Sequence, residues 1–293
     1  MRKLLGLTLV TALLAVSCAF INPISSSQIP ADSQSAAMAE LHKGDVPVAS
    51  PAAKDVDPDS VTAEEIVYGN FNDIPFGGYL VKPADATEPL PGLIVIQEWW
   101  GLNDNIRTMT RRLAAEGYTA LAVDLYDGKV ATNRDEAKTL VQEAIQNSDR
   151  LTQNVVAAYN FLADEQQSPK VGSLGWCFGG SWSLNTALAL PTELDAAVIY
   201  YGGQISTDAS VLAPLQMPIQ GHFGALDTNP SPDTVQAFET ALNDLEKDTE
   251  IYVYEDANHA FANPSGTRYN APAADLSWQR TVAFLKQHLQ SDG

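Results

Sequence analysis

Residues 171–180 read VGSLGWCFGG, an apolar run that leads into a cysteine set among glycines. A reactive side chain at the end of a central strand needs a sharp strand-to-helix turn, and small neighbours let the backbone make that turn without clashes. Residues 181–190 can form a helix whose N-terminus points at Cys177, an arrangement that favours a thiolate. The pattern predicts a nucleophile elbow, although a lone cysteine beside aromatic residues is more often part of the core.

Strand-like and helix-like segments alternate around this elbow. Alternation at these lengths indicates an α/β fold with a mostly parallel central sheet and helices on both faces. Two short strands before it form an antiparallel pair, with a turn that contains Pro75, Gly77 and Gly78. The predicted strands are 64–68, 78–82, 93–97, 118–125, 170–174, 196–201, 218–224 and 250–254, and the predicted helices are 106–114, 134–147, 149–163, 181–190, 233–247 and 275–289.

The first 17 residues have the features of an export signal. Arg2 and Lys3 precede an apolar stretch, 4–16, that ends in small residues. This stretch is shorter than the ~20 residues that span a bilayer. Cys18 follows a small residue, as in bacterial lipoprotein processing sites, so we expect a periplasmic or cell-surface protein anchored through lipidated Cys18. Ordinary cleavage that discards Cys18 is the alternative.

Residues 18–60 are rich in Ser, Ala, Pro, Gln and Asp, without apolar periodicity, and this composition predicts a disordered tether. Residues 61–293 suit one domain. Its only cysteine is Cys177, so no disulfide can form within it. The net charge is −19, or −21 once the two basic residues of the signal are removed. Nucleic acid is excluded as a partner because binding phosphates needs a basic patch.

A thiol nucleophile needs a base, and the predicted domain has three histidines. His288 lies on the polar side of the last predicted helix, and His222 lies inside a strand, where a hydrogen-bonded core role is more common. His259 follows strand 250–254 on a loop. Catalytic groups of open α/β sheets gather at the carboxyl ends of the strands. His259 is therefore the predicted base.

The acid that orients this base is predicted to be Asp227, on the loop after strand 218–224. Asp256 is the competitor, but its closeness to His259 in sequence fits a turn cap better. The order Cys177, Asp227, His259 is that of nucleophile, acid and base in α/β-hydrolases.

The segment 97–101, QEWWG, follows another strand end. A tetrahedral intermediate needs two hydrogen-bond donors, one after the nucleophile and one from the early strand-to-helix loop. We assign the backbone N–H groups of Phe178 and Trp99. Trp100 is a candidate substrate contact, with packing as an equally good explanation.

These motifs resemble the dienelactone hydrolase family over nearly all of residues 61–293. The resemblance is carried by QEWWG at 97–101, DLY at 124–126, GWCFGG at 175–180, GHFGALD at 221–227 and HAF at 259–261. It implies an α/β-hydrolase fold and a cysteine hydrolase of small esters or lactones, with neither cofactor nor metal. It also implies that Glu98 engages the resting thiol and helps to form the thiolate, and that Tyr126 contacts substrate.

Two positions depart from the family. Members that cleave dienelactone hold the substrate carboxylate with two arginines, at positions where this sequence has Gly128 and Asn263. Lys129 and Arg268 are the nearest cations that could replace them. The resemblance therefore extends to the catalytic residues and not to the substrate.

We predict an exported cysteine hydrolase that forms an acyl-cysteine on a small-molecule ester or lactone; the sequence does not indicate an oligomeric state. One alternative is a catalytically idle binding lipoprotein with this fold, which the complete triad disfavours. The other is a redox protein, which lacks a second thiol to resolve a disulfide.

Overall fold

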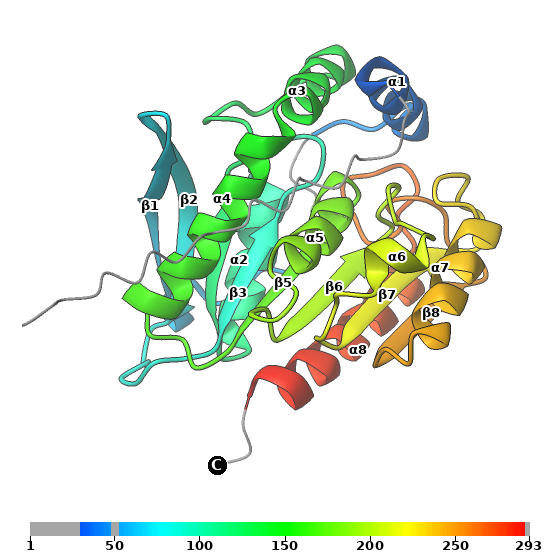
Figure 1. Cartoon of the computed structure of the whole chain (residues 1–293). Helices are drawn as coiled ribbons and strands as arrows, with labels where there is room; N and C mark the ends of the chain where they lie inside the picture. The colour runs from blue at the N-terminus through cyan, green and yellow to red at the C-terminus, as the bar shows by residue number, and fades with distance from the viewer. Residues whose placement is uncertain (1–29, 48–52, 291–293) are drawn as a thin grey trace, which may run out of the picture.

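The computed structural model describes residues 30–47 and 53–290. Its strands form a single eight-stranded sheet in the order β1-β2-β4-β3-β5-β6-β7-β8 (Figure 1). The strands are β1 Val61–Phe71, β2 Ile74–Pro83, β3 Gly92–Ile96, β4 Thr119–Val123, β5 Val171–Trp176, β6 Ala196–Tyr200, β7 Ile219–Gly224 and β8 Thr249–Tyr254.

The sheet is parallel from β4 to β8, while β1 pairs with β2, and β2 with β4, in antiparallel fashion. The predicted α/β fold and the antiparallel first pair are confirmed. The predicted turn is wrong, because Pro75 and Gly77 lie within β2. The reversal is made instead by Asn72 and Asp73, whose φ angles of 49° and 62° are the positive values that Asn and Asp tolerate in tight hairpin turns.

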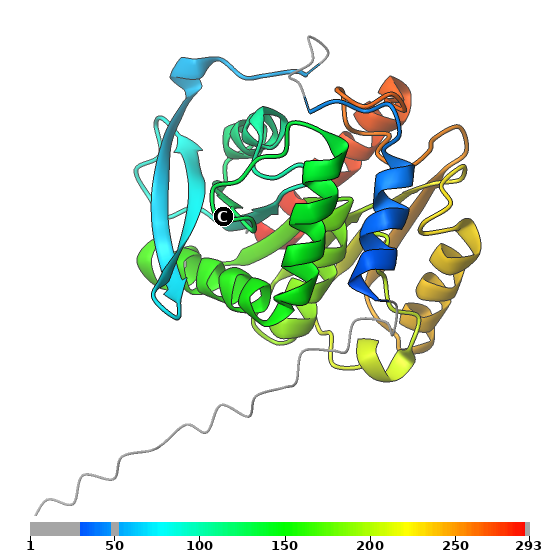
Figure 2. The same cartoon turned by 90° about the horizontal axis from the view of Figure 1, so that it is seen from above.

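Helices cover both faces of the sheet. The helices α4 and α5 lie on one face, and α2 and α8 on the other (Figures 1 and 2). The helices are α1 Ala31–Leu41, α2 Asp104–Ala115, α3 Arg134–Gln146, α4 Ser148–Asn160, α5 Phe178–Ala189, α6 Ala209–Leu212, α7 Pro232–Asp244 and α8 Ala271–Leu289, with a 3-10 turn at Pro58–Ser60 and a π-helical turn at Phe161–Glu165.

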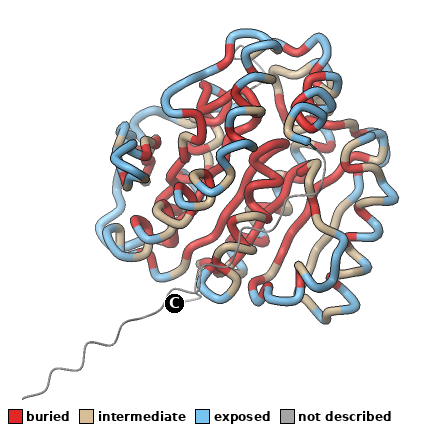
Figure 3. The backbone as a smooth tube through the Cα atoms, turned by 45° about the horizontal axis from the view of Figure 1, so that its top comes forward, coloured by how far each residue is buried: buried red, intermediate tan, exposed pale blue. Residues whose placement is uncertain are grey.

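The central strands form the core. Every residue of β3, β4, β5 and β6 is buried, in keeping with their largely apolar sequences (Figure 3). Because parallel strands point the same way, the loops after β3, β5, β7 and β8 meet at one edge of the sheet. The predicted catalytic residues lie on these loops.

The predicted disordered tether is wrong for residues 30–47. Residues 31–41 form α1, which packs beside α3 (Figure 2). Arg134 donates a hydrogen bond to the carbonyl of Ala39, and Gln142 donates one to Asp32. The predicted signal, Cys18 and the rest of the predicted tether up to residue 29, together with 48–52, lie outside the described residues. Within the described part, none of the helices combines the length and apolar character that a membrane crossing requires.

Candidate active site

The nucleophile elbow forms as the sequence predicts. Cys177 stands between β5 and α5 with φ 57° and ψ −113°, a strained conformation for a residue with a side chain. A Cβ at Gly175 would lie 2.2 Å from the carbonyl oxygen of Gly179, and one at Gly179 would lie 2.3 Å from that of Ile96. Glycine is therefore required at both positions to bring the strand, the turn and the helix this close.

Cys177, His259 and Asp227 form a continuous hydrogen-bonded chain. The Nε2 of His259 lies 3.2 Å from the Sγ of Cys177, and its Nδ1 lies 2.8 Å from Oδ2 of Asp227. The other oxygen of Asp227 accepts the backbone N–H of Asn229 at 2.8 Å, which fixes the carboxylate plane. The carboxylate can only accept, so Nδ1 carries the proton and Nε2 offers its lone pair to the thiol.

The alternative candidates for the base and the acid, His222 and Asp256, do not contact the thiol or His259. His222 lies within β7, and its buried side chain contacts the hydroxyl groups of Tyr254 and Thr281 and the amide oxygen of Gln220. Asp256 is exposed. The predicted core role of His222 is confirmed, and Asp227 is the acid that contacts His259.

The resting nucleophile is a neutral thiol. Burial raises the pKa of Cys177 well above its ordinary value, and the nearby Glu98 raises it further, while the backbone N–H of Phe178 lowers it. The N-terminus of α5 does point at Cys177, yet desolvation outweighs its effect. This direction agrees with the resting thiol that the family resemblance implies, and the helix N-terminus favours the thiolate once it forms.

Glu98 is buried at the carboxyl end of β3, where its Oε2 accepts a hydrogen bond of 2.6 Å from Asn263. Burial raises the pKa of Glu98 from 4.5 to about 8, the negative charge of Asp45 adds to this effect, and the Asn263 hydrogen bond opposes it. At neutral pH the group is thus mostly a carboxylic acid. The prediction that Glu98 engages the resting thiol is wrong, because its Oε2 is bound to Asn263 and the side-chain partners of the thiol are His42 and His259.

The residues predicted for the oxyanion hole and the substrate contact are buried in the loops that follow β3 and β4 and at the start of α5. Trp99 and Trp100 follow Glu98 directly, and both rings are buried, with centroids 4.6 Å apart. The ring of Tyr126 is buried 5.7 Å from that of Phe178. All four therefore lie at the carboxyl edge of the sheet, where the prediction places them.

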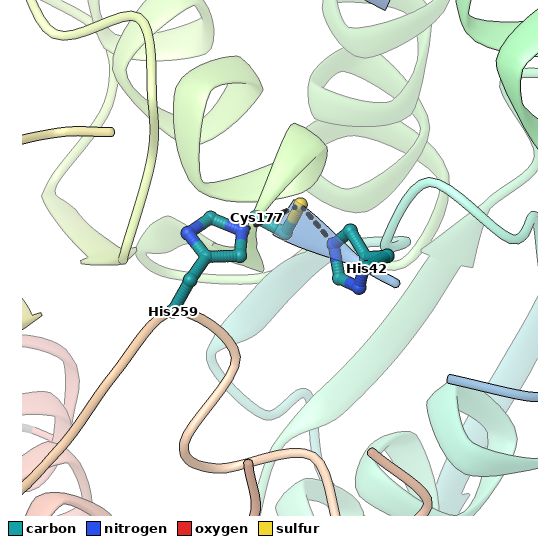
Figure 4. Close-up of side chains that lie close together, drawn as sticks. All are labelled: His42, Cys177 and His259. Atoms are coloured by element: carbon teal, nitrogen blue, oxygen red, sulfur yellow. Dashed lines mark hydrogen bonds between the residues drawn. The ribbon is translucent and has the colours of Figure 1, made fainter. Parts of the chain in front are cut away.

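His42 is a site residue that the sequence analysis misses. It follows α1 directly, its ring is buried, and its Nε2 lies 3.4 Å from the Sγ of Cys177, across from His259 (Figure 4). Its Nδ1 lies 2.9 Å from Oδ2 of Asp45. Burial lowers the pKa of His42 to about 4 although the Asp45 hydrogen bond opposes this, so the ring is neutral at pH 7.

Asp45 is itself firmly held. It accepts hydrogen bonds from the backbone N–H and the hydroxyl of Thr267, at 2.8 and 2.6 Å, and it pairs with Arg268 at 3.2 Å. Burial alone would raise the pKa of Asp45, but the hydrogen bonds from His42 and Thr267 prevail and hold it well below its ordinary value. The thiol thus lies between two imidazoles, each backed by a carboxylate.

The N-terminal segment closes the site. The exposed fraction is 1% for Cys177, 1% for His259 and 0% for His42. The His42 ring stacks on that of Trp99, with centroids 4.5 Å apart. Segment 30–47, named the cover segment below, therefore shields the thiol from solvent.

Neither Lys129 nor Arg268 takes the place of the two arginines that the family has at positions 128 and 263. Gly128 is exposed, and Asn263 binds Glu98. Lys129 pairs with Glu143 on the surface at 3.3 Å. Arg268 donates to the carbonyl of His259 at 3.1 Å in addition to its contact with Asp45, which commits it to the protein itself.

Comparison with known proteins agrees with this fold. The profile of the Dienelactone hydrolase family matches residues 76–289, and the chain belongs to this family. A protein of Escherichia coli (strain K12) with the provisional name carboxymethylenebutenolidase is 31% identical over 265 residues, covering 84% of this chain and 95% of that protein.

Solved structures extend the comparison. The crystal structure of a provisionally assigned dienelactone hydrolase from Klebsiella pneumoniae has a TM-score of 0.69 at 29% identity, covering 78% of this chain and 99% of that one. That of dienelactone hydrolase from Anabaena variabilis, at 20% identity, has a TM-score of 0.60 over 79% of this chain and 100% of that one, and supports the α/β-hydrolase fold alone. His42 lies outside the residues that the family profile matches.

Proposed function

We propose that this member of the dienelactone hydrolase family cleaves a small ester or lactone through an acyl-cysteine intermediate on Cys177. The observation that carries the proposal is the hydrogen-bonded chain from Cys177 through His259 to Asp227 at the carboxyl edge of the sheet. The relatives named as dienelactone hydrolase or carboxymethylenebutenolidase support the substrate class.

The first half of the reaction transfers the acyl group. Nε2 of His259 takes the thiol proton while Sγ attacks the carbonyl carbon, and the N–H groups of Phe178 and Trp99 are the proposed donors to the oxyanion. The C–O bond to the alcohol then breaks, and the imidazolium of His259 returns the proton to the departing oxygen. Asp227 stabilises the imidazolium in between.

The second half hydrolyses the thioester. His259 takes a proton from water, the resulting hydroxide attacks the acyl carbon, and the carbon–sulfur bond breaks. The sulfur recovers its proton from His259, so that one ester and one water yield one acid and one alcohol. Glu98 is a neutral acid at rest, so it places no negative charge near the thiolate as it forms.

Access to the thiol requires movement of the cover segment, because Cys177 is buried beneath it. The substrate is proposed to be a neutral ester or lactone, since Asn263 and Arg268 are engaged with Glu98 and Asp45. We also propose that the protein is exported and anchored through lipidated Cys18, on the basis of its first 18 residues. A mature N-terminus found downstream of Cys18 by mass spectrometry would contradict the anchor.

The test of the enzymatic proposal is a panel of acyl esters and lactones assayed with the purified chain and with Cys177→Ala. We expect hydrolysis of at least one class by the wild type and its loss in the variant. A variant that retains near-normal turnover would overturn the mechanism, and a wild type inactive on every class would favour a binding protein.

A further inference from the structure

The cover segment places a second imidazole–carboxylate pair on the catalytic thiol. His42 and His259 approach Sγ of Cys177 from different sides, with Nε2–Sγ separations of 3.4 and 3.2 Å (Figure 4). A thiol has one proton to donate, so it can satisfy only one of the two Nε2 lone pairs at a time. One of the two buried Nε2 lone pairs therefore faces the sulfur without a hydrogen bond from it.

The three donor atoms converge closely. Sγ and the two Nε2 atoms all lie within 4.8 Å of one another, the one such group of Cys, His, Asp and Glu side chains found among residues 30–47 and 53–290. Zinc binds sulfur at about 2.3 Å and imidazole nitrogen at about 2.0 Å, which puts two tetrahedral ligands about 3.5 Å apart. The observed sulfur–nitrogen separations already approach this value.

The surroundings of the imidazoles match those of metal ligands. The Nδ1 of each ring faces a carboxylate, Asp45 at 2.9 Å for His42 and Asp227 at 2.8 Å for His259. Carboxylates in this position fix the tautomer so that Nε2 is free to bind a cation, and they make the nitrogen more basic. Stacking on Trp99 further fixes the His42 ring.

We propose that His42, Cys177 and His259 form a binding site for a thiophilic divalent cation, with zinc as the best match. One thiolate and two imidazoles are the ligand types that zinc and cadmium select over magnesium or calcium. Three protein ligands leave a fourth coordination position for water or a small ligand. Binding replaces the S–H bond with a metal–sulfur bond and releases that proton to solvent.

This site exists only while the cover segment is closed, because His42 belongs to that segment. A bound cation ties up the sulfur and both imidazoles, so it holds the closed form and blocks acylation of Cys177. By linkage, whatever opens the segment also weakens the cation site. The inference rests on the geometry of three side chains and not on the hydrolase activity.

Cadmium binding tests the proposal, because thiolate-to-cadmium charge transfer absorbs in the ultraviolet. All proteins carry Cys18→Ser, so that Cys177 is the remaining thiol of the chain. The full chain is stripped of metal and titrated with cadmium, and zinc is then added in competition. We expect a saturable band that zinc abolishes and that Cys177→Ala lacks.

The variants separate this site from simple thiol binding. His42→Ala should weaken cadmium binding at least tenfold, and Asp45→Asn should weaken it by roughly 10- to 100-fold if it acts through His42. His288→Ala is the matched control, because His288 lies near the C-terminal end of α8 and outside the proposed site. This variant should bind cadmium as tightly as the wild type. Zinc should also raise the melting temperature of the wild type but not of His42→Ala.

Equal cadmium affinity in the wild type and His42→Ala would overturn the proposal, as would a wild type without a charge-transfer band. Should His42→Ala fail to fold, the comparison of Asp45→Asn with the wild type decides in the same way. Each of these readouts is independent of ester hydrolysis, so the metal site and the proposed enzymatic function can fail separately.

Discussion

Replacing Glu98 by glutamine isolates the effect of burying one carboxyl group. Its pKa rises from 4.5 to about 8 in the folded chain, chiefly through burial. Between these two values the folded state retains a proton that the unfolded state has released. The contribution of Glu98 to stability is therefore full below pH 4.5 and is lost as the pH rises toward 8.

The magnitude follows from the size of this shift. In the middle of the window each pH unit changes the free energy of unfolding by about 1.4 kcal/mol, and near either pKa the change is smaller, so the loss between pH 5 and pH 8 comes to about 3 kcal/mol. Glutamine has the same shape and keeps an oxygen that can accept the hydrogen bond from Asn263, but it does not titrate. The variant should therefore lack this pH-dependent loss in the free energy of unfolding.

The assay is urea unfolding of the wild type and Glu98→Gln in metal-free buffer at about pH 5 and pH 8. The free energy of unfolding of the variant, relative to that of the wild type, should rise by about 3 kcal/mol from pH 5 to pH 8. Other titrating groups cancel in this difference. Glu64→Gln, at an exposed position of β1, is the control and should show no such gain. A Glu98→Gln difference that stays constant with pH would refute the reasoning.

Three further predictions concern the thiol and its surroundings. Cys177→Ala, His259→Ala and the double variant should lower kcat by similar, non-additive factors, because the two side chains act as a unit. Asp45→Asn should speed alkylation of Cys177 by uncharged iodoacetamide roughly tenfold, since it weakens the contacts that hold the cover segment. An ester with a free carboxylate should have a lower kcat/KM than its neutral methylated analogue, because the two contacts that would favour an anion by roughly 100-fold are missing.

Each of these outcomes has a control. Additive losses in the double variant would mean that Cys177 and His259 act separately. Asp275→Asn, which breaks an exposed ion pair with Lys54, should leave the rate of alkylation unchanged. Equal effects of Asp275→Asn and Asp45→Asn would mean that Asp45 has no specific role in holding the cover segment. A preference for the anion that Arg268→Ala abolishes would show that Arg268 binds substrate after all.

The fold and the triad could be predicted because their signals are local and strong. The buried strand β3 is a continuous apolar run, and the elbow requires glycine where the backbone approaches within 2.2–2.3 Å of a Cβ position. His259 and Asp227 each follow a strand directly. Their convergence then follows from the parallel sheet.

The cover segment was missed because its helix has almost no apolar face. The buried residues of α1 are Gln34, Ser35, Met38 and Ala39, mostly small or polar, and a composition of this kind is typical of a tether. Their spacing, continued by His42, does have helical periodicity, which is the one signal that could have revealed the helix. Placing the domain boundary at residue 61 removed His42 from the set of possible bases.

The strength with which Cys177 is held as a thiol could not be predicted, because two opposing effects act on its pKa. The helix N-terminus favours a thiolate and burial favours the thiol, and only the depth of Cys177 in the fold shows that burial prevails. The Glu98–Asn263 hydrogen bond could not be predicted either, because it joins residues 165 positions apart in the sequence.

Trapping the acyl-enzyme shows whether Cys177 is the nucleophile. The chain is mixed with an activated neutral ester, quenched in acid within a turnover, and analysed by intact mass and peptide mapping. We predict one acyl group per chain, located on Cys177, that disappears as substrate is exhausted and is absent from Cys177→Ala. Turnover by the wild type without any adduct on Cys177, together with undiminished turnover by Cys177→Ala, would contradict the account.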